Sequence, residues 1–203
     1  MNKYIPTYDN HNEKQEKNPK HHHEPPKQTV ILKCGTATGS VPLNFGLLGG
    51  GLQAEGVANG YSFSPVLASV VLDTENLINP TIKIDFSSLI SFRTTSQNYQ
   101  LRLIFTLKKV CKGQKVELGT WTFEELTNVS DGVSGEYVQE TESFGFTWCE
   151  CNDCPDCCRY IVEVSTGPGF NIDFAFVSNI ALAATAVGLA KTNEKREHDG
   201  CCD

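Results

Sequence analysis

Cysteine is the residue type in this chain with the widest capacity for chemistry. The chain has 203 residues and nine cysteines, and five of the nine lie in the stretch 146–160, FTWCECNDCPDCCRY. A thiolate can bind a metal ion, attack a disulfide or form one. The spacing is C-x-C-x2-C-x2-C-C, at Cys149, Cys151, Cys154, Cys157 and Cys158. Three interpretations follow, which are a metal site, a redox-active thiol and a set of disulfides.

A zinc or iron–sulfur site is the first interpretation. Zinc takes four ligands in a tetrahedron, often as two C-x2-4-C pairs, and iron–sulfur clusters are held by closely spaced cysteines. Cys151, Cys154 and Cys157 supply three such sulfurs, with Cys149 or Cys158 as the fourth. Structural zinc sites usually take two ligands from a second, distant pair, and none is present. A metal site is therefore the alternative interpretation of the cluster.

Disulfides, some of them between subunits, are the interpretation that we favour. Cys154-Pro-Asp-Cys157 has C-x-x-C form, but no βαβ pattern surrounds it as in a thioredoxin-like site. Nine is an odd number of cysteines, so full oxidation would leave at least one to pair with another chain. The candidates for disulfide formation are all nine: Cys34, Cys111, Cys149, Cys151, Cys154, Cys157, Cys158, Cys201 and Cys202.

Four of these cysteines lie outside the cluster. Cys201 and Cys202 end a polar tail that can extend about 35–40 Å from residue 190, far enough to meet a neighbouring copy. Cys34 ends the first predicted strand and is the next candidate for a cross-link. Cys111 lies beside the turn CKGQK and is a candidate for an internal pair instead.

The hydrophobic pattern has a period of two, which is typical of half-buried strands. In NYQLRLIFTLKK and TIKIDF every second residue is apolar, and the same holds for RYIVEV. In FNIDFAF the predicted apolar face is Phe170, Ile172, Phe174 and Phe176. Further strands are predicted at 29–34, 66–72, 116–123 and 137–148, and 180–190 is expected to continue as strand. Polar turns separate these segments, which indicates an all-β antiparallel sandwich, a jelly roll.

Three parts of the chain differ in composition. Residues 1–27 are polar and are predicted to be a disordered arm, and 191–203 a flexible cysteine-bearing tail. Residues 28–190 form the predicted sandwich domain. Within it, the glycine-rich tract 41–65 is expected to be irregular or an edge segment. The cysteine cluster is expected on the connection of a β-hairpin, with Cys149 and Cys151 pointing to the same side of their strand.

Composition and charge argue against several function classes. The formal net charge of −7 disfavours nucleic-acid binding, which needs a basic footprint. All five histidines lie in the arm and the tail, so the domain lacks the usual general base, and we expect no enzyme and no cofactor. The apolar run 180–190 is too short to span a bilayer, so no membrane partner is expected. The N-terminal residues also lack the apolar core of a secretory signal.

The stretches 64–92 and 144–164 resemble a clostridial family of uncharacterised cysteine-rich proteins, over roughly residues 34–187. That family has no assigned enzymatic role, so the resemblance supplies no catalytic residues. The layout is also similar to the pilins of bacterial spore appendages, which are jelly rolls with N-terminal arms, inter-subunit disulfides and no signal peptide. In those pilins the paired cysteines lie near the N-terminus, whereas here the arm region has only Cys34 and the pair is C-terminal.

These observations lead to one main functional hypothesis. The chain is expected to be a structural, self-assembling subunit of a spore-surface layer or extracellular fibre, cross-linked by inter-subunit disulfides and placed there without a signal peptide. Its expected partners are further copies and other spore-surface proteins. A soluble metal-binding module is the alternative, and a carbohydrate- or receptor-binding jelly roll that uses Trp121, Trp148 and Tyr160 is a weaker third hypothesis.

Overall fold

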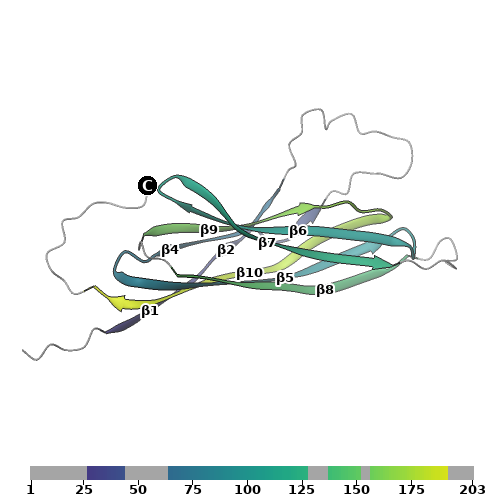
Figure 1. Ribbon diagram of the computed structural model, residues 1–203. Coiled ribbons are helices and arrows are strands. Elements are labelled where there is room, and N and C mark those ends of the chain that lie inside the picture. Colours follow the sequence, from purple (N-terminus) through teal and green to yellow (C-terminus); the bar gives the residue numbers. More distant parts are fainter. Residues whose placement is uncertain (1–26, 44–63, 128–136, 152–155, 192–203) are drawn as a thin grey trace, which may run out of the picture.

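A computed structural model describes residues 27–43, 64–127, 137–151 and 156–191, and it confirms an all-β fold. The predicted arm and tail lie outside these residues, apart from Lys27 and Lys191, as do Cys154, Cys201 and Cys202. Figure 1 shows the strands in two layers. They are β1 (Gln28–Cys34), β2 (Thr36–Ala37), β3 (Val41–Leu43), β4 (Val66–Asp73), β5 (Leu77–Thr94), β6 (Tyr99–Cys111), β7 (Gln114–Thr127), β8 (Gln139–Cys151), β9 (Cys157–Thr166) and β10 (Ile172–Ala190).

The strand order defines a jelly roll. One sheet, called sheet A here, has the order β1-β10-β5-β8, with β3 also pairing with β10, and the other, sheet B, has the order β2-β4-β9-β6-β7. All pairings are antiparallel. From β3 to β10 the chain changes sheet at every connection except the β6–β7 hairpin. This double Greek key confirms the predicted topology.

Alternating side chains build the core between the two sheets. On β5, Ile82, Ile84 and Phe86 are buried, and on β6 every second residue from Tyr99 to Leu107 is buried. Aromatic rings join the layers: Phe105 of sheet B stacks on Phe144 of sheet A at 4.2 Å between centroids. Because the two inner faces interdigitate, each sheet buries its apolar face against the other.

The predicted hairpin around the cysteine cluster is wrong. β8 pairs with β5 in sheet A, whereas β9 pairs with β4 and β6 in sheet B. Their connection therefore crosses from one layer to the other. The period-two pattern correctly located both strands, but it identifies only which residues share a face and carries no information about which strand is the neighbour.

Strand β10 confirms the predicted extension through 180–190 but reverses the predicted apolar face at its start. Ala175 and Val177 face the core, whereas Phe174 and Phe176 are half-buried on the outer side, where their rings stack on each other. A register shift between Ser178 and Ala181 then changes the face, because an extra residue in a strand turns the following side chains over. Which side chains of β10 face the core depends on this bulge, and the alternation of apolar residues in the sequence does not reveal where a bulge lies.

Both ends of the described chain lie beside the cysteine-bearing connection. Ala190 donates a backbone hydrogen bond to the Lys27 carbonyl at 2.9 Å, and Lys191 donates one to the Asn76 carbonyl at 3.0 Å in the β4–β5 connection. The β6–β7 turn, the end of β8 and the start of β9 lie at this same end (Figure 1). We call it the cysteine end. Segments that precede β1 and follow β10 therefore start from the end of the sandwich that carries the cluster.

An ion-pair group lies on the outer face of sheet B. The carboxylate of Glu163 accepts hydrogen bonds from Lys108 at 2.5 Å and from Lys115 at 3.0 Å. Burial raises the pKa of Glu163, but these two lysines outweigh it and leave that pKa below its usual value. The group connects three neighbouring strands of sheet B, since the residues belong to β9, β6 and β7.

Replacing Phe105 by Ala is expected to lower the free energy of unfolding by about 3–5 kcal/mol, because a fully buried aromatic ring leaves a cavity. Urea unfolding monitored by circular dichroism measures the change. Leu126→Ala is the matched control, since Leu126 is 52% exposed, and it should change stability little. Equal effects of the two substitutions would contradict the assignment of the core.

The Glu163→Gln variant is expected to lose about 1–3 kcal/mol of stability at neutral pH, because two lysines lose a charged partner. A carboxyl whose folded pKa is lowered stabilises the fold above its unfolded pKa of about 4.3 and loses that contribution as the pH falls. The difference between wild type and variant should therefore shrink below about pH 4.3 in urea titrations at several pH values. A difference independent of pH would contradict this account.

Candidate functional site

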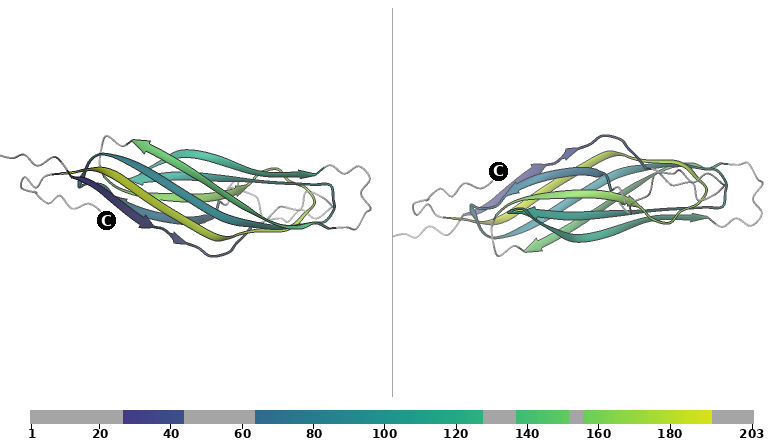
Figure 2. Two further views of the ribbon diagram at one scale, coloured as in Figure 1. Left: turned by 90° about the horizontal axis from the view of Figure 1, so that it is seen from below. Right: turned by 90° about the horizontal axis from the view of Figure 1, so that it is seen from above.

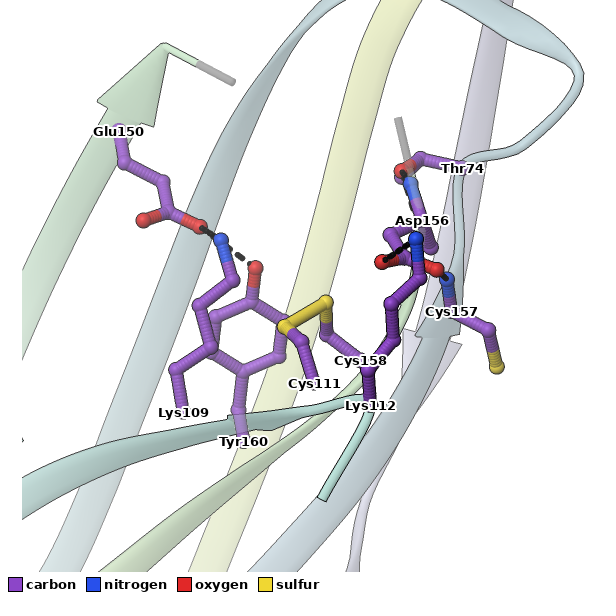
Figure 3. The surroundings of a disulfide bond; sticks show 9 residues. All are labelled: Thr74, Lys109, Cys111, Lys112, Glu150, Asp156, Cys157, Cys158 and Tyr160. Atoms are coloured by element: carbon purple, nitrogen blue, oxygen red, sulfur yellow. Dashed lines mark hydrogen bonds and ion pairs between the residues drawn. A yellow bond between two sulfur atoms is a disulfide. The ribbon is translucent and has the colours of Figure 1, made fainter. Parts of the chain in front are cut away.

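A disulfide between Cys111 and Cys158 closes the cysteine end of sheet B (Figure 3). The two residues are directly opposite each other in the β6–β9 pairing, with Cα atoms 4.6 Å apart. This separation lies within the range that disulfides require. Cys158 is buried and Cys111 half-buried, so the bond joins the apolar core at its edge. It links two strands that are 47 residues apart in sequence.

The turn after Cys111 places this half-cystine at the end of its strand. Lys112 and Gly113 form a two-residue hairpin connection between Cys111 and its partner Gln114, with φ values of 49° and 75°. Two positive φ values are typical of the type I′ turn, whose twist matches that of the flanking strands. Glycine takes this conformation without cost, which fits the Gly in the predicted turn CKGQK.

A charged group connects the two sheets beside this disulfide. Glu150 of sheet A accepts hydrogen bonds from Lys109 at 2.7 Å and from the Tyr160 hydroxyl at 2.6 Å, both in sheet B. The Lys109 ammonium also lies 5.8 Å from the centre of the Tyr160 ring. Burial, followed by the hydrogen bond and charge of Glu150, raises the pKa of Tyr160 far above its usual range. The hydroxyl therefore stays protonated and donates to Glu150.

Sequence analysis missed Glu150 and Lys109. Both occupy inward-facing positions of strands whose preceding inward residues are apolar, such as Trp148 before Glu150 and Leu107 before Lys109. Burying a charged side chain at a core-facing position costs free energy unless the charge is paired. A lysine and a glutamate at such positions near the ends of two strands could therefore have predicted an ion pair between the sheets.

The β8–β9 connection is fixed where it enters β9. The Asp156 carbonyl accepts hydrogen bonds from the Thr74 amide at 3.0 Å and from its hydroxyl at 2.9 Å, and the Asp156 amide donates to that hydroxyl at 3.1 Å. Lys112 forms an ion pair with the Asp156 carboxylate at 3.1 Å (Figure 3). Cys157, which follows, is also disulfide-bonded. Through Thr74, Lys112 and Asp156, the β4–β5 connection, the β6–β7 turn and the start of β9 are thus bonded to one another.

The predicted cluster is divided between the two sheets. Cys149 and Cys151 are exposed free thiols on the outer face of sheet A, on the same side of β8 as predicted, whereas Cys158 faces the core of sheet B. Cys34, the third free thiol in the described ranges, is also exposed on the outer face of sheet A. Because Cys158 is in a disulfide, its sulfur is not available to a metal ion. The part of the chain that the structure describes holds no group of three or more potential metal ligands.

The aromatic residues of the carbohydrate hypothesis serve the core instead. Tyr160 is fully buried, and the Trp121 ring stacks on Phe146 at 3.8 Å and meets Trp148 edge-on at 6.2 Å. A hollow of about 270 Å³ at the cysteine end has none of these three aromatic residues in its lining, which is formed by Lys109, Cys111, Gln114, Val116, Leu118 and Glu150. This volume is below the range of about 300–1,000 Å³ that is typical of small-molecule sites. The geometry therefore gives no support to that third hypothesis.

The fold and these sulfurs define a class of protein: an antiparallel jelly roll with an internal disulfide and free thiols on the outer face of one sheet. A family model described as Domain of unknown function (DUF4489) matches residues 28–187, and the chain belongs to that family. The match includes both stretches that carry the resemblance described above. Clostridial origin and the likeness to spore-appendage pilins stay predictions. No curated protein matches the chain.

Among solved structures, the chain is similar to two of infectious bursal disease virus, from the Gx strain and the Gt strain. The sequence identities are 14% and 16%, and the TM-scores are 0.33 and 0.32. The matches cover 84% and 82% of this chain, which spans 38% of the length of each viral chain. In the described ranges, the chain contains no helix of the length and apolarity that a membrane span requires.

Removing the internal disulfide with Cys111→Ala and Cys158→Ala together should lower the free energy of unfolding by about 2–4 kcal/mol, because the cross-link restricts the unfolded chain. Urea unfolding measures the loss. The matched control is Cys149→Ser with Cys151→Ser, which changes two exposed thiols and should leave stability within about 0.5 kcal/mol of wild type. A loss in the control and none in the disulfide variant would contradict the assignment.

Proposed function

We propose that this chain is a structural subunit that assembles with copies of itself, joined by disulfides between subunits, into a layer on the spore surface or an extracellular fibre. The observation that carries the proposal is that Cys34, Cys149 and Cys151 are exposed free thiols on strands β1 and β8. A disulfide already closes the core edge at Cys111 and Cys158, which suits a protein that matures under oxidising conditions.

The three exposed thiols cannot pair with one another inside one chain. Cys149 and Cys151 are two residues apart on one face of β8, so their Cβ atoms are about 6.6–6.8 Å apart, whereas a disulfide needs about 3.5–4.5 Å. Cys34 lies on β1, three strands away from β8, which is about 14 Å. A disulfide at any of these three thiols therefore needs another cysteine of the same chain, such as Cys154, Cys201 or Cys202, or a cysteine of a second copy, which is the partner proposed here.

Edge strands offer a second means of association. β8 ends sheet A and β7 ends sheet B, so each leaves one row of backbone hydrogen-bonding groups without a strand partner in the described parts of the chain. An antiparallel edge of this kind can take up a strand from a neighbour. The location on a spore surface rests on the resemblance of residues 64–92 and 144–164 to the clostridial cysteine-rich family, and the fibre form rests on analogy with spore-appendage pilins.

Oxidised protein should form covalent multimers. On a non-reducing gel, purified chain treated with oxidised glutathione is expected to give a ladder of multimers that collapses to monomer with dithiothreitol, and negative-stain electron microscopy should show sheets or fibres. Protein alkylated with iodoacetamide before oxidation is the control and should stay monomeric on the gel. Monomer alone after oxidation, with one equivalent of tightly bound zinc or iron in anaerobically purified protein, would contradict the proposal and favour a metal-binding module.

A further inference from the structure

The outer face of sheet A is more apolar at the cysteine end than a solvated surface requires. The pairing register aligns outward side chains in rows that run across β1, β10, β5 and β8. On β1, the outward side chains of Val30 and Leu32 are 63% and 65% exposed. Leu189 on β10 and its partner Ile78 on β5 are 40% and 41% exposed. Four of the ten exposed large hydrophobic side chains in the described ranges therefore lie on one face at one end.

The free thiols border this apolar face on its two opposite edges. One row runs Leu32, Thr185, Lys83, Cys149, the row nearer the cysteine end runs Val30, Val187, Thr81, Cys151, and the row on the other side runs Cys34, Ala183, Asp85, Thr147. Cys34 thus lies on the β1 edge, and Cys149 and Cys151 lie on the β8 edge. Figure 2, left, looks onto this face, with β1 in purple, β10 in yellow and β8 in green.

We propose that this face is a self-docking surface, on which two copies pack face to face about a two-fold axis parallel to the strands, so that Cys34 of each copy pairs with Cys149 of the other. The inference rests on the proposed function and names one contact between its subunits, a closed dimer that further contacts would join into a layer or fibre. A rotation of 180° about such an axis turns the sheet over and exchanges its edges. β1 of one copy then lies over β8 of the other, twice in one dimer.

The register supports this pairing. Cys34 and Cys149 are one row apart, which is about 6.6–6.8 Å along the strands. Sheets that pack face to face are rotated by about 30°, and at an edge about 7 Å from the centre of the face that rotation shifts positions along the strands by about 3.5 Å, roughly half of the offset between the two thiols. Small side chains at the centre of the face, Ala183 and Thr185, permit close approach of the two sheets.

Charges on the face do not oppose the contact. The main ones, Lys83 and Asp85, form an ion pair with each other at 2.9 Å, and Asp85 also accepts a hydrogen bond from Thr147 at 2.8 Å. Since both charges are compensated within one copy, a second copy needs to supply only apolar contact and thiols. Under the two-fold axis, β5 of one copy faces β10 of the other, so Lys83 and Asp85 meet Thr185 and Ala183.

The chain's own ends are poorer occupants of this face. Residues 192–203, TNEKREHDGCCD, can reach the thiols, since they follow Lys191 at the cysteine end, but they hold no aliphatic or aromatic side chain to cover Val30 and Leu32. Residues 1–26 hold no cysteine. Compared with these two segments, a second copy offers both apolar side chains and the missing thiol.

The cross-link is a thiol–disulfide exchange with a small-molecule disulfide as oxidant. A thiolate of Cys149 attacks oxidised glutathione, which forms a mixed disulfide and releases one reduced glutathione. The Cys34 thiolate of the other copy then attacks the Cys149 sulfur of that mixed disulfide and displaces the second glutathione. Two protein thiols are oxidised and one glutathione disulfide is reduced to two thiols, so electrons balance.

The test uses the full chain with Cys201→Ser and Cys202→Ser, which removes the tail thiols. Oxidation with oxidised glutathione is expected to give a covalent dimer on non-reducing gels, and mass spectrometry of its peptides should find Cys34 joined to Cys149. Adding Cys34→Ser, or Cys149→Ser with Cys151→Ser, should reduce the dimer at least tenfold. A dimer that survives Cys34→Ser, or peptides that join Cys34 to Cys34, would overturn the proposal.

A second pair of variants tests the apolar contact. Leu32→Asp is expected to slow covalent dimer formation at least tenfold, because it places a charge in the contact. Leu126→Asp is the control, since Leu126 is also an exposed leucine but lies on the outer face of sheet B, and it should leave the rate unchanged. Circular dichroism checks that both variants fold. Equal rates for the two variants would overturn the docking surface.

These outcomes separate the two proposals. If the unmodified chain forms covalent multimers but the variant without tail thiols stays monomeric, the tail is the occupant, the docking surface is wrong and the proposed function stands. If the unmodified chain stays monomeric under oxidation, both proposals fail.

Discussion

The arrangement of the cysteines depends on one constraint, which is that β8 and β9 belong to opposite sheets. Because the connection between them crosses from one layer to the other, residues a few positions apart face different environments. Cys149, Glu150 and Cys151 alternate outward, inward, outward at the end of β8, and Cys158 faces inward from β9. Within the compact cysteine motif, Cys158 thereby joins an internal disulfide at the edge of the core, whereas Cys149 and Cys151 are free thiols on the surface of sheet A.

The same crossing brings residues of both sheets together at the cysteine end, where a disulfide, an ion pair and hydrogen bonds connect the strands. At this end the two sheets meet at Glu150, whose carboxylate receives Lys109 and Tyr160 from the opposite layer. Removing one partner of a partly buried ion pair leaves a charge without its partner, so we expect Glu150, Lys109 and Tyr160 to act together. The Cys111–Cys158 bond and the Thr74–Asp156 hydrogen bonds fix the adjoining connections. In the proposed assembly, thiols carried on strands anchored in this way would be held in place before a second copy binds, which would lower the ordering cost of a cross-link.

Sequence reasoning could predict the fold to the extent that burial sets it. Alternation located the strands, and it predicted that Cys149 and Cys151 share a face, because side-chain direction has a strict period of two. It failed where a single residue changes the register, as at the bulge after Ser178, and where the choice of strand partner is set by the whole topology, as for β8 and β9. The sequence indicated Cys111 as a candidate for an internal disulfide but not its partner. Predicting Cys158 as that partner requires knowing that β9 lies beside β6, and in which register.

In the proposed assembly, charge and sulfur would act in opposite directions on the association of copies. The formal net charge of −7 makes copies repel one another, and at physiological salt that repulsion is screened beyond about 8 Å. At the outer face of sheet A the local charges cancel between Lys83 and Asp85, so the repulsion is weakest where the apolar side chains and thiols are gathered. A covalent bond formed there would hold against the remaining repulsion, and it would make assembly depend on the redox state of the surroundings rather than on protein concentration alone.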